Sequence, residues 1–398
     1  MPFRKTCSME ERVRMLVEYA TGAFTVSELA ARYGVSRETF YVWLKRRVSG
    51  DARWFEDRSH VPQSCPQRTE ADIVAEVVAM RERFEHFGPK KIRARLMSDR
   101  PDVAWPAAST MGDILKRAGL VAPRACRRRR AEPAAVIAPP ALAANAEWSV
   151  DFKGWFRTRD GRRCDPLTVS DTASRYLLAA RIVEPTSAEV RKAFERVFAE
   201  NGLPSAMRCD NGSPFGSAGA SGLSRLAVWW LRLGIEPHYI RPASPQENGR
   251  HERMHRVLKA ETSTPPAASA AEQQARFDVF RKHFNEDRPH EGLGQTPPAA
   301  HWRPSARPFM ARPAEPWYDA NHEVRRVRPD GTIKWRGEHV FIGEALVREL
   351  IGLQELERGG HMVRFCRRDL GILDRDHRFV RFAPPYVKLA KTEDAKDE

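Results

Sequence analysis

The stretch that decides the fold of this chain is Trp148-Ser-Val-Asp151-Phe-Lys-Gly154. Its apolar and β-branched residues predict a strand over residues 148–152, and a glycine follows shortly after. Asp151 lies inside that strand, between two apolar neighbours. A carboxylate is costly to bury in an apolar strand unless it is paired or bound to a metal ion. We therefore expect this strand to carry a functional acid.

The pattern around this strand predicts a mixed α/β domain over residues 146–308. Further strands are expected at 166–170, 176–182, 206–209 and 235–240. Helices are expected at 187–201, 222–233, 246–261 and 270–284. Three strands followed by alternating helices and strands indicate a mixed sheet with helices on both faces.

Two further acidic residues stand in suggestive positions. Asp210 follows the strand at 206–209, just before Asn211-Gly212, and Glu252 lies on the helix at 246–261. Hard carboxylate oxygens from two strands and a helix could converge on divalent cations such as Mg²⁺. Two such ions about 3.5–4 Å apart would suit phosphodiester chemistry. Each acid also has an ordinary explanation, as a turn residue or as an i, i+4 partner of Arg256.

The local context of the three acids resembles one family, the bacterial insertion-sequence transposases with a DDE catalytic core like that of retroviral integrases. The matching stretches are Trp148-Ser-Val-Asp151-Phe-Lys-Gly154, Arg208-Cys-Asp210-Asn-Gly-Ser-Pro-Phe215 and Ser244-Pro-Gln-Glu-Asn-Gly-Arg-His-Glu252-Arg-Met-His-Arg-Val-Leu-Lys259. Phe284-Asn-Glu-Asp-Arg-Pro-His290 and Thr296-Pro-Pro-Ala-Ala300 resemble the end of the same core. The resemblance covers roughly residues 145–305.

This resemblance implies an RNase H-like core in which Asp151, Asp210 and Glu252 are the catalytic residues. They would also bind two Mg²⁺ or Mn²⁺ ions. The family further implies a DNA contact at Lys259, two helical turns after Glu252. Asn248 and Arg256 are the remaining candidate DNA contacts of this region.

One departure from the family lies between the second and third acids. The stretch Gly216-Ser-Ala-Gly-Ala-Ser-Gly222 makes their spacing longer than is common. We expect a loop insertion there that leaves the acids in place.

Residues 1–60 are predicted to form a helix-turn-helix DNA-binding domain. Thr25-Val-Ser-Glu28 has the form of a capping box, and Gly34-Val-Ser36 predicts a tight turn before a third helix over residues 37–46. The outward side of that helix carries the candidate DNA contacts Arg37, Thr39, Tyr41 and Lys45.

Residues 61–121 predict a second helix-turn-helix-like domain, with Lys90 and Lys91 as candidate DNA contacts. The alternative is a solvated basic face on an interaction domain. Residues 122–145 read as a basic linker rich in Arg, Pro and Ala. It carries the candidate DNA contacts Arg127, Arg128, Arg129 and Arg130. A flexible tether is the plainer interpretation, and both can hold.

Residues 309–387 predict a small β-barrel domain made of short strands. A hairpin is expected with Asp330-Gly331 as its tight turn. Residues 388–398 form a charged tail that we expect to be disordered.

Composition narrows the class of protein. The chain has 398 residues, with 67 Lys plus Arg against 52 Asp plus Glu, a formal net charge of +15 that favours a polyanionic partner such as nucleic acid. A hydrophobic content of 41% excludes a wholly disordered chain. We see no membrane span, signal peptide, paired-cysteine zinc motif, Walker A motif or GxGxxG. We therefore expect a cytoplasmic, nucleoid-associated protein with no membrane partner and no nucleotide cofactor.

A competing motif overlaps the third acid. His251-Glu252-Arg-Met-His255 satisfies the His-Glu-x-x-His pattern of zinc proteases, with Glu272 or Glu286 as the nearest third ligand. The strongly basic surroundings count against a protease. Two more hypotheses are a DNA-binding regulator without catalysis and a simple nuclease of the same fold.

The sequence thus predicts a DDE-type transposase that binds the terminal inverted repeats of an insertion sequence. It would cleave and join strands by in-line transesterification. Its partners would be double-stranded DNA of the element ends and the target. The family implies at least a homodimer, since two ends must be brought together.

Overall fold

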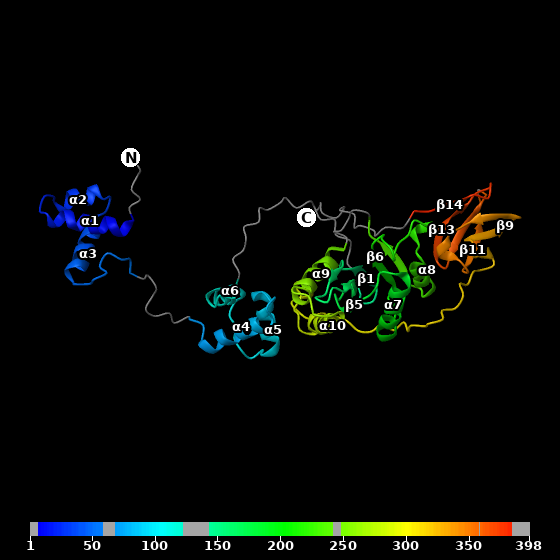
Figure 1. Cartoon of the computed structure of the whole chain (residues 1–398), viewed down its shortest axis with the longest axis horizontal. Helices are drawn as coiled ribbons and strands as arrows, with labels where there is room; N and C mark the ends of the chain where they lie inside the picture. Colours follow the sequence, from blue (N-terminus) through cyan, green and yellow to red (C-terminus); the bar gives the residue numbers. More distant parts are fainter. Residues whose placement is uncertain (1–6, 59–67, 122–142, 242–247, 358, 384–398) are drawn as a thin grey trace, which may run out of the picture. The chain divides into compact units, whose positions relative to one another are not determined.

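The computed structural model describes residues 7–58, 68–121, 143–241, 248–357 and 359–383 (Figure 1). The chain divides into two compact units, Met1–Thr69 and Glu70–Glu398. Most of the expected linker, with Arg127, Arg128, Arg129 and Arg130, lies outside the described residues, as does the charged tail. None of the described helices is both long and apolar enough to cross a membrane.

The first unit contains three short helices. They are α1 (Ser8–Ala20), α2 (Val26–Arg32) and α3 (Arg37–Val48). The expected capping box is confirmed, because the Thr25 hydroxyl accepts from the Glu28 backbone N–H while the Glu28 carboxylate accepts from the Thr25 N–H. The Ser36 hydroxyl caps α3 by accepting from the Thr39 backbone N–H. Leu16, Leu29 and Phe40 are fully buried where the helices meet.

The second unit begins with three more helices. They are α4 (Ala71–Arg83), α5 (Pro89–Asp99) and α6 (Ala108–Arg117). Val77, Ile92 and Met111, one from each helix, are fully buried together. Proline suits the first position of α5, because an N–H there would have no intrahelical acceptor. The helix α6 begins after Ala107, which makes no side-chain cap.

A five-stranded mixed sheet forms the centre of the second unit. Its strands are β1 (Glu147–Phe152), β4 (Pro166–Asp171), β5 (Leu177–Ile182), β6 (Ala206–Cys209) and β7 (Glu236–Tyr239). Their order is β5-β4-β1-β6-β7, with β1 antiparallel to β4 and parallel to β6. The expected strands and the mixed sheet are confirmed.

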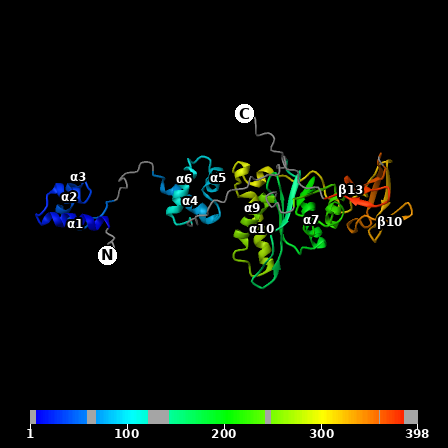
Figure 2. The ribbon, with the colours of Figure 1, turned by 90° about the horizontal axis from the view of Figure 1, so that it is seen from above.

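Helices cover both faces of this sheet (Figures 1 and 2). They are α7 (Ser187–Asn201), α8 (Arg225–Arg232), α9 (Gly249–Thr262) and α10 (Ala270–Glu286). On one face Phe194 of α7 and Trp230 of α8 share a core with Val150 of β1. On the other, Leu258 of α9 and Phe277 of α10 pack with residues of β5. The arrangement on two faces follows the expectation.

Short elements complete the core domain. A hairpin of β2 (Phe156–Arg157) and β3 (Arg163–Cys164) leaves the main sheet between β1 and β4. The helix expected from residue 222 begins at Arg225, because Ser224 caps it after a short 3₁₀ turn. The 3₁₀ turns are η1 (Ala220–Gly222), η3 (Glu291–Leu293), η4 (Pro298–His301) and η5 (Glu344–Leu346).

The C-terminal part is a small antiparallel β domain. Its strands are β8 (His322–Arg326), β9 (Thr332–Trp335), β10 (Glu338–Phe341), β11 (Leu350–Glu355), β12 (His361–Phe365), β13 (Arg368–Leu373) and β14 (Phe379–Arg381). They form a five-stranded sheet in the order β14-β13-β12-β11-β8 and a two-stranded sheet of β10 and β9.

The expected hairpin across Asp330-Gly331 is wrong in its pairing. The strand β8 pairs with β11, whereas β9 pairs with β10. A tight turn is present at Asp330-Gly331, where the Gly331 N–H donates to the Arg328 carbonyl at 2.9 Å. The turn between the paired strands β9 and β10 lies at Arg336-Gly337, where both residues have positive φ, 44° and 96°. This backbone suits a two-residue hairpin turn, although only one of the two residues is glycine.

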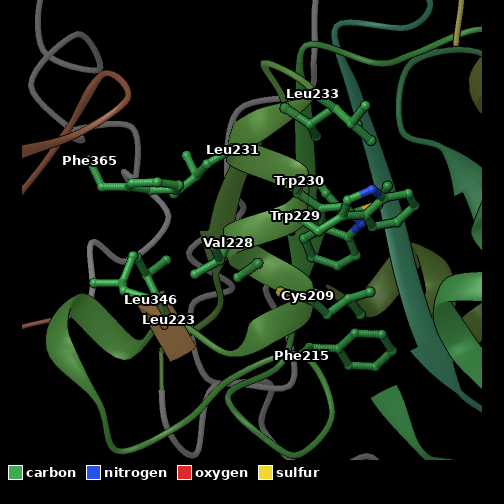
Figure 3. Packing of buried hydrophobic residues seen from close by; sticks show 14 of the residues in the cluster. Cys209, Phe215, Leu223, Val228, Trp229, Trp230, Leu231, Leu233, Leu346 and Phe365 are labelled. Carbon is green, nitrogen blue, oxygen red and sulfur yellow. The ribbon is translucent and has the colours of Figure 1, made fainter. Parts of the chain in front are cut away.

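The β domain packs directly against the domain built on the mixed sheet. Figure 3 shows Val228 and Leu231 of α8 together with Phe365 and Leu346 from the β domain, all members of one buried cluster. Arg232 at the end of α8 forms an ion pair with Glu349 at 2.6 Å. The two domains therefore share one hydrophobic core.

Candidate active site

Two of the three predicted acids lie at the same edge of the central sheet. The strands β1 and β6 run parallel, and Ser149 is the partner of Arg208 in their register. Asp151 and Asp210 each follow two residues after this pair. Because the strands are neighbours and parallel, both carboxylates leave the sheet at its carboxyl edge.

The third acid is carried by α9, which is anchored over this sheet. At the start of the helix, the Asn248 side-chain oxygen accepts a hydrogen bond of 2.9 Å from the Ser149 hydroxyl, and both groups are buried. His251 and His255 face inward, whereas Glu252 is exposed. Asn248 therefore holds the helix on β1, and its side chain is part of the fold instead of an open DNA-facing surface.

The pKa of Asp151 responds to the charges of the other two acids. Burial, followed by the negative charge of Asp210 and then that of Glu252, raises the pKa of Asp151 to about 7. Burial also raises the pKa of Asp210, while a hydrogen bond of 3.2 Å from the Gly212 N–H opposes this. Neighbouring negative charges that raise the pKa of a buried carboxyl group indicate a region of negative potential around Asp151.

The chemistry of these donors fits a hard divalent cation. Carboxylate oxygens are the ligands that Mg²⁺ prefers, and a cation would relieve the repulsion that raises the pKa of Asp151. Within the described ranges, however, no group of three His, Cys, Asp or Glu side chains is arranged to hold a metal ion. Binding of an ion by all three acids is therefore a proposal.

A buried hydrogen-bond network behind the acids joins α9 to the sheet. The Thr168 hydroxyl on β4 lies 2.7 Å from Nε2 of His251 and 2.6 Å from Nε2 of His255. It also donates to the backbone carbonyl of Asp151 at 3.0 Å. Ser170 reaches Nδ1 of His251 at 3.0 Å. One threonine therefore connects β4, β1 and the helix that carries Glu252.

The hydrogen count of this network assigns the proton positions. The single Thr168 proton goes to the Asp151 carbonyl, so both histidines must donate their Nε2–H to the threonine oxygen. Burial lowers the pKa of His251 to about 3, and burial followed by the charge of His251 lowers the pKa of His255 to about 2. Both imidazole rings are therefore neutral. Nδ1 of His255 lies 3.8 Å from the Asp151 carboxylate, but a neutral ring does not compensate the charge of that carboxylate.

The His-Glu-x-x-His motif therefore has a structural use in this fold. Three of the four imidazole nitrogens of His251 and His255 are engaged by hydroxyl groups of β4. Glu272, one of the two expected third zinc ligands, accepts instead from the Ala268 N–H and from Arg276. These contacts account for the motif without a zinc protease.

The other predicted DNA contacts fall into three groups. On α3, Arg37, Tyr41 and Lys45 are exposed one turn apart, while the Thr39 hydroxyl lies 2.9 Å from that of Ser36. On α9, Arg256 and Lys259 are exposed on the side that carries Glu252. The third group, on α5, differs from both.

The basic residues of α5 lie beside the core domain. Lys90 forms an exposed ion pair of 3.2 Å with Glu291. Burial, followed by the charge of Arg288, lowers the pKa of Lys91 to about 8. Arg95 pairs with Asp287 at 2.9 Å. This face therefore contacts the protein itself.

Sequence reasoning missed a buried ionic cluster at the start of β1. Glu147 on β1 contacts Arg208 at 2.6 Å and His238 at 2.8 Å. Burial opposes ionisation of Glu147, but His238 and Arg208 outweigh it and lower its pKa. A charged residue at the start of an otherwise apolar strand was the available signal.

Comparisons with known families agree with this architecture. The family described as "Integrase core domain" matches residues 141–245 and, in a second form, residues 233–298. The family described as "Helix-turn-helix domain" matches residues 11–51. The chain therefore carries an integrase core domain and a helix-turn-helix domain.

Two curated relatives are insertion-element proteins. An uncharacterized 39.2 kDa protein of insertion element IS476 from Xanthomonas euvesicatoria is 26% identical over 245 residues, which are 60% of this chain and 66% of that protein. An uncharacterized 31.7 kDa protein of insertion element IS407 from Burkholderia multivorans is 28% identical over 192 residues, 47% of this chain and 65% of that protein. The chain thus spans just under two thirds of each relative.

Solved structures with similar chains come from retroviruses. An intasome of simian T-cell lymphotropic virus in complex with PP2A regulatory subunit B56 gamma has 17% identity and a TM-score of 0.37, covering 72% of this chain and 91% of that chain. The HTLV-2 integrase catalytic core domain in complex with magnesium has 17% identity and a TM-score of 0.33, and the match covers 40% of this chain and 99% of that chain.

Proposed function

We propose that this protein, which has the integrase-like core and helix-turn-helix domain of an insertion-sequence transposase, cleaves the ends of an insertion sequence and joins them to target DNA. The proposal is supported by two acids that follow neighbouring parallel strands, Asp151 and Asp210, and by the pKa of Asp151, which burial, then the charge of Asp210 and then that of Glu252 raise to about 7. A site that concentrates negative charge in this way suits metal-dependent phosphodiester chemistry.

Asp151, Asp210 and Glu252 would hold two Mg²⁺ or Mn²⁺ ions. Such ions, when bound, make an attacking hydroxyl more nucleophilic and stabilise the leaving oxygen of a phosphodiester. The protein itself positions the acids. The two strands fix the aspartates, and Asn248 and Thr168 hold α9 against the sheet. The exposed Arg256 and Lys259 would contact phosphates beside the acids.

The remaining regions would bind the DNA ends. We assign residues 1–60 to recognition of the terminal inverted repeats, 61–121 to a second helical domain, 122–145 to a basic linker, 146–308 to the catalytic core and 309–387 to a β domain, closed as a barrel, that contacts the phosphate backbone. Residues 388–398 would be a charged tail. Because two element ends must meet, the active form would be at least a homodimer on double-stranded DNA, in the cytoplasm and associated with the nucleoid.

The test is strand transfer of a labelled terminal-repeat oligonucleotide in the presence of Mg²⁺. We expect joined products from the wild type and none from Asp151→Asn, which keeps the size of the side chain but removes its charge. Asp102→Asn, at an exposed aspartate of the second helical region, is the matched control and should retain activity. Binding of the oligonucleotide should survive in all three proteins.

Two outcomes would favour a different function. Binding without any product in wild type or variant would support a DNA-binding regulator. Cleaved DNA without joined products would support a nuclease of the same fold.

A further inference from the structure

We propose that the β2–β3 hairpin is a binding site for unpaired nucleotides beside the three acids, with Trp155 as the surface on which a base stacks. This inference rests on the proposed function for its biological setting. Its physical basis is separate, because it comes from the exposure, charge and anchoring of the hairpin segment, residues 153–165.

Trp155 is unusual among the tryptophans of the core domain. Its side chain is 58% exposed, whereas Trp148, Trp229 and Trp230 are buried. The Arg157 and Arg163 guanidinium carbons lie over its ring, 5.9 Å and 5.3 Å from the centroid. Large exposed aromatic side chains flanked by cations are typical of sites at which nucleic-acid bases stack and phosphates bind.

Charge on the hairpin favours a polyanion over another protein copy. Besides the two arginines over the indole, Arg159 and Arg162 are exposed, and Lys153 precedes them. The acids of the segment are already engaged. Asp160 accepts from the Thr158 hydroxyl, and Asp165 accepts two hydrogen bonds of 2.8 Å from Arg163. Two copies of such a surface would repel each other.

The hairpin is anchored, so its exposed groups are held in place before a ligand arrives. The Arg159 and Asp160 N–H groups donate to the carbonyls of Ala267 and Ala268 at 3.0 and 3.1 Å. Phe156 packs edge-on against Phe277 of α10 with ring centroids 6.5 Å apart. A surface that is already ordered loses less conformational entropy on binding than a free loop would.

The hairpin follows Asp151 closely along the chain. Trp155 follows Asp151 by only four positions along the chain. An extended chain of that length spans at most about 14 Å, the length of roughly four stacked nucleotides of a DNA strand. A DNA strand held at the acids would therefore pass the hairpin within a few nucleotides of the reacting phosphate, where cut ends expose unpaired bases.

The experiment measures binding of a fluorescent single-stranded oligonucleotide, and of the same sequence as a blunt duplex, by anisotropy without divalent ions. Trp155→Ala should weaken single-strand binding by roughly 5- to 100-fold, since stacking on one aromatic side chain has that effect. Trp155→Phe should retain most of the affinity. Val279→Ala is the control, because Val279 on α10 is 57% exposed and lies in the same domain but outside the hairpin.

A second pair of variants tests the charges. Arg162→Gln should reduce the slope of log Kd against log salt by about 0.7, the change expected for one phosphate contact to a single strand. Arg196→Gln, at an exposed arginine of α7, should leave that slope unchanged. Thermal melting checks that all variants fold.

Several results would overturn the proposal. The proposal fails if Trp155→Ala binds the single strand as tightly as wild type, or if Val279→Ala loses as much affinity as Trp155→Ala. It also fails if Trp155→Ala changes the sedimentation of the protein and leaves its DNA affinity unchanged, because the hairpin would then be a protein-binding surface. The test separates the two proposals, because it needs neither metal nor catalysis. If wild type performs strand transfer but Trp155→Ala binds the single strand normally, only the proposed hairpin site is refuted. If binding depends on Trp155 but no strand transfer occurs, only the proposed transposase function is refuted.

Discussion

Replacing Thr168 with valine should loosen the helix that carries Glu252. Valine has nearly the shape of threonine but no hydroxyl, so two buried imidazole N–H groups and the Asp151 carbonyl lose their partner. Each buried donor left without an acceptor costs about 1–3 kcal/mol. We therefore expect Thr168→Val to lower the free energy of unfolding of the second unit by about 2–5 kcal/mol.

The measurement is urea denaturation followed by circular dichroism, with Thr168→Ser as the control. Serine keeps the hydroxyl and loses one methyl group, which costs roughly 1 kcal/mol. Strand transfer should fall by about 100-fold in the folded valine variant, because a shift of about 1 Å in a positioning element has effects of that size. The reasoning is refuted if valine lies within about 0.5 kcal/mol of wild type, or if serine is as unstable as valine.

Two further predictions concern buried charges. Lys91→Met should stabilise the second unit by about 1–3 kcal/mol at pH 7, because the folded-state pKa of Lys91 is about 8 against an ordinary 10.5. The penalty of its charge is complete below pH 8 and disappears as the pH rises through 10.5, so wild type and variant should converge in alkaline melts. An advantage that persists at high pH would contradict this. Glu147→Gln should destabilise the fold by about 2–3 kcal/mol at neutral pH, since Arg208 loses its ion pair. Because the folded-state pKa of Glu147 is lowered, this contribution is present above the ordinary value of 4.5 and is lost as the pH falls through the folded pKa. The free energies of unfolding of wild type and Glu147→Gln, measured by urea titration, should therefore differ at pH 7 and agree in acid. A difference that is the same at every pH would show that the charge of Glu147 does not stabilise the fold.

The contacts of α5 change how the second helical region is understood. Its basic residues suggest DNA binding when only their charge is considered. In the fold, Lys91 is largely withdrawn from solvent and Arg95 is paired with Asp287 of the core domain. Charge counted along a sequence does not show whether a protein carboxylate already lies opposite.

The sequence by itself predicted local secondary structure and helix caps, because these depend on residues that are close along the chain. The capping box at Thr25 and Glu28 needs only residues three apart, and the strand at 147–152 needs only alternating apolar side chains. The three acids could be selected because their flanking residues form recognisable stretches. These are properties of short segments, for which the distance along the chain limits the distance in space.

Only the tertiary structure decided which segments meet. The strand β8 pairs with β11 in place of β9, although a tight turn at Asp330-Gly331 lies between β8 and β9 along the chain. Thr168 and His255, which are 87 residues apart, share a hydrogen bond that no local pattern announces. Trp155 could not be distinguished from a core tryptophan by its type. Burial and pairing depend on what the rest of the chain brings to a residue, so they become defined only when the chain folds.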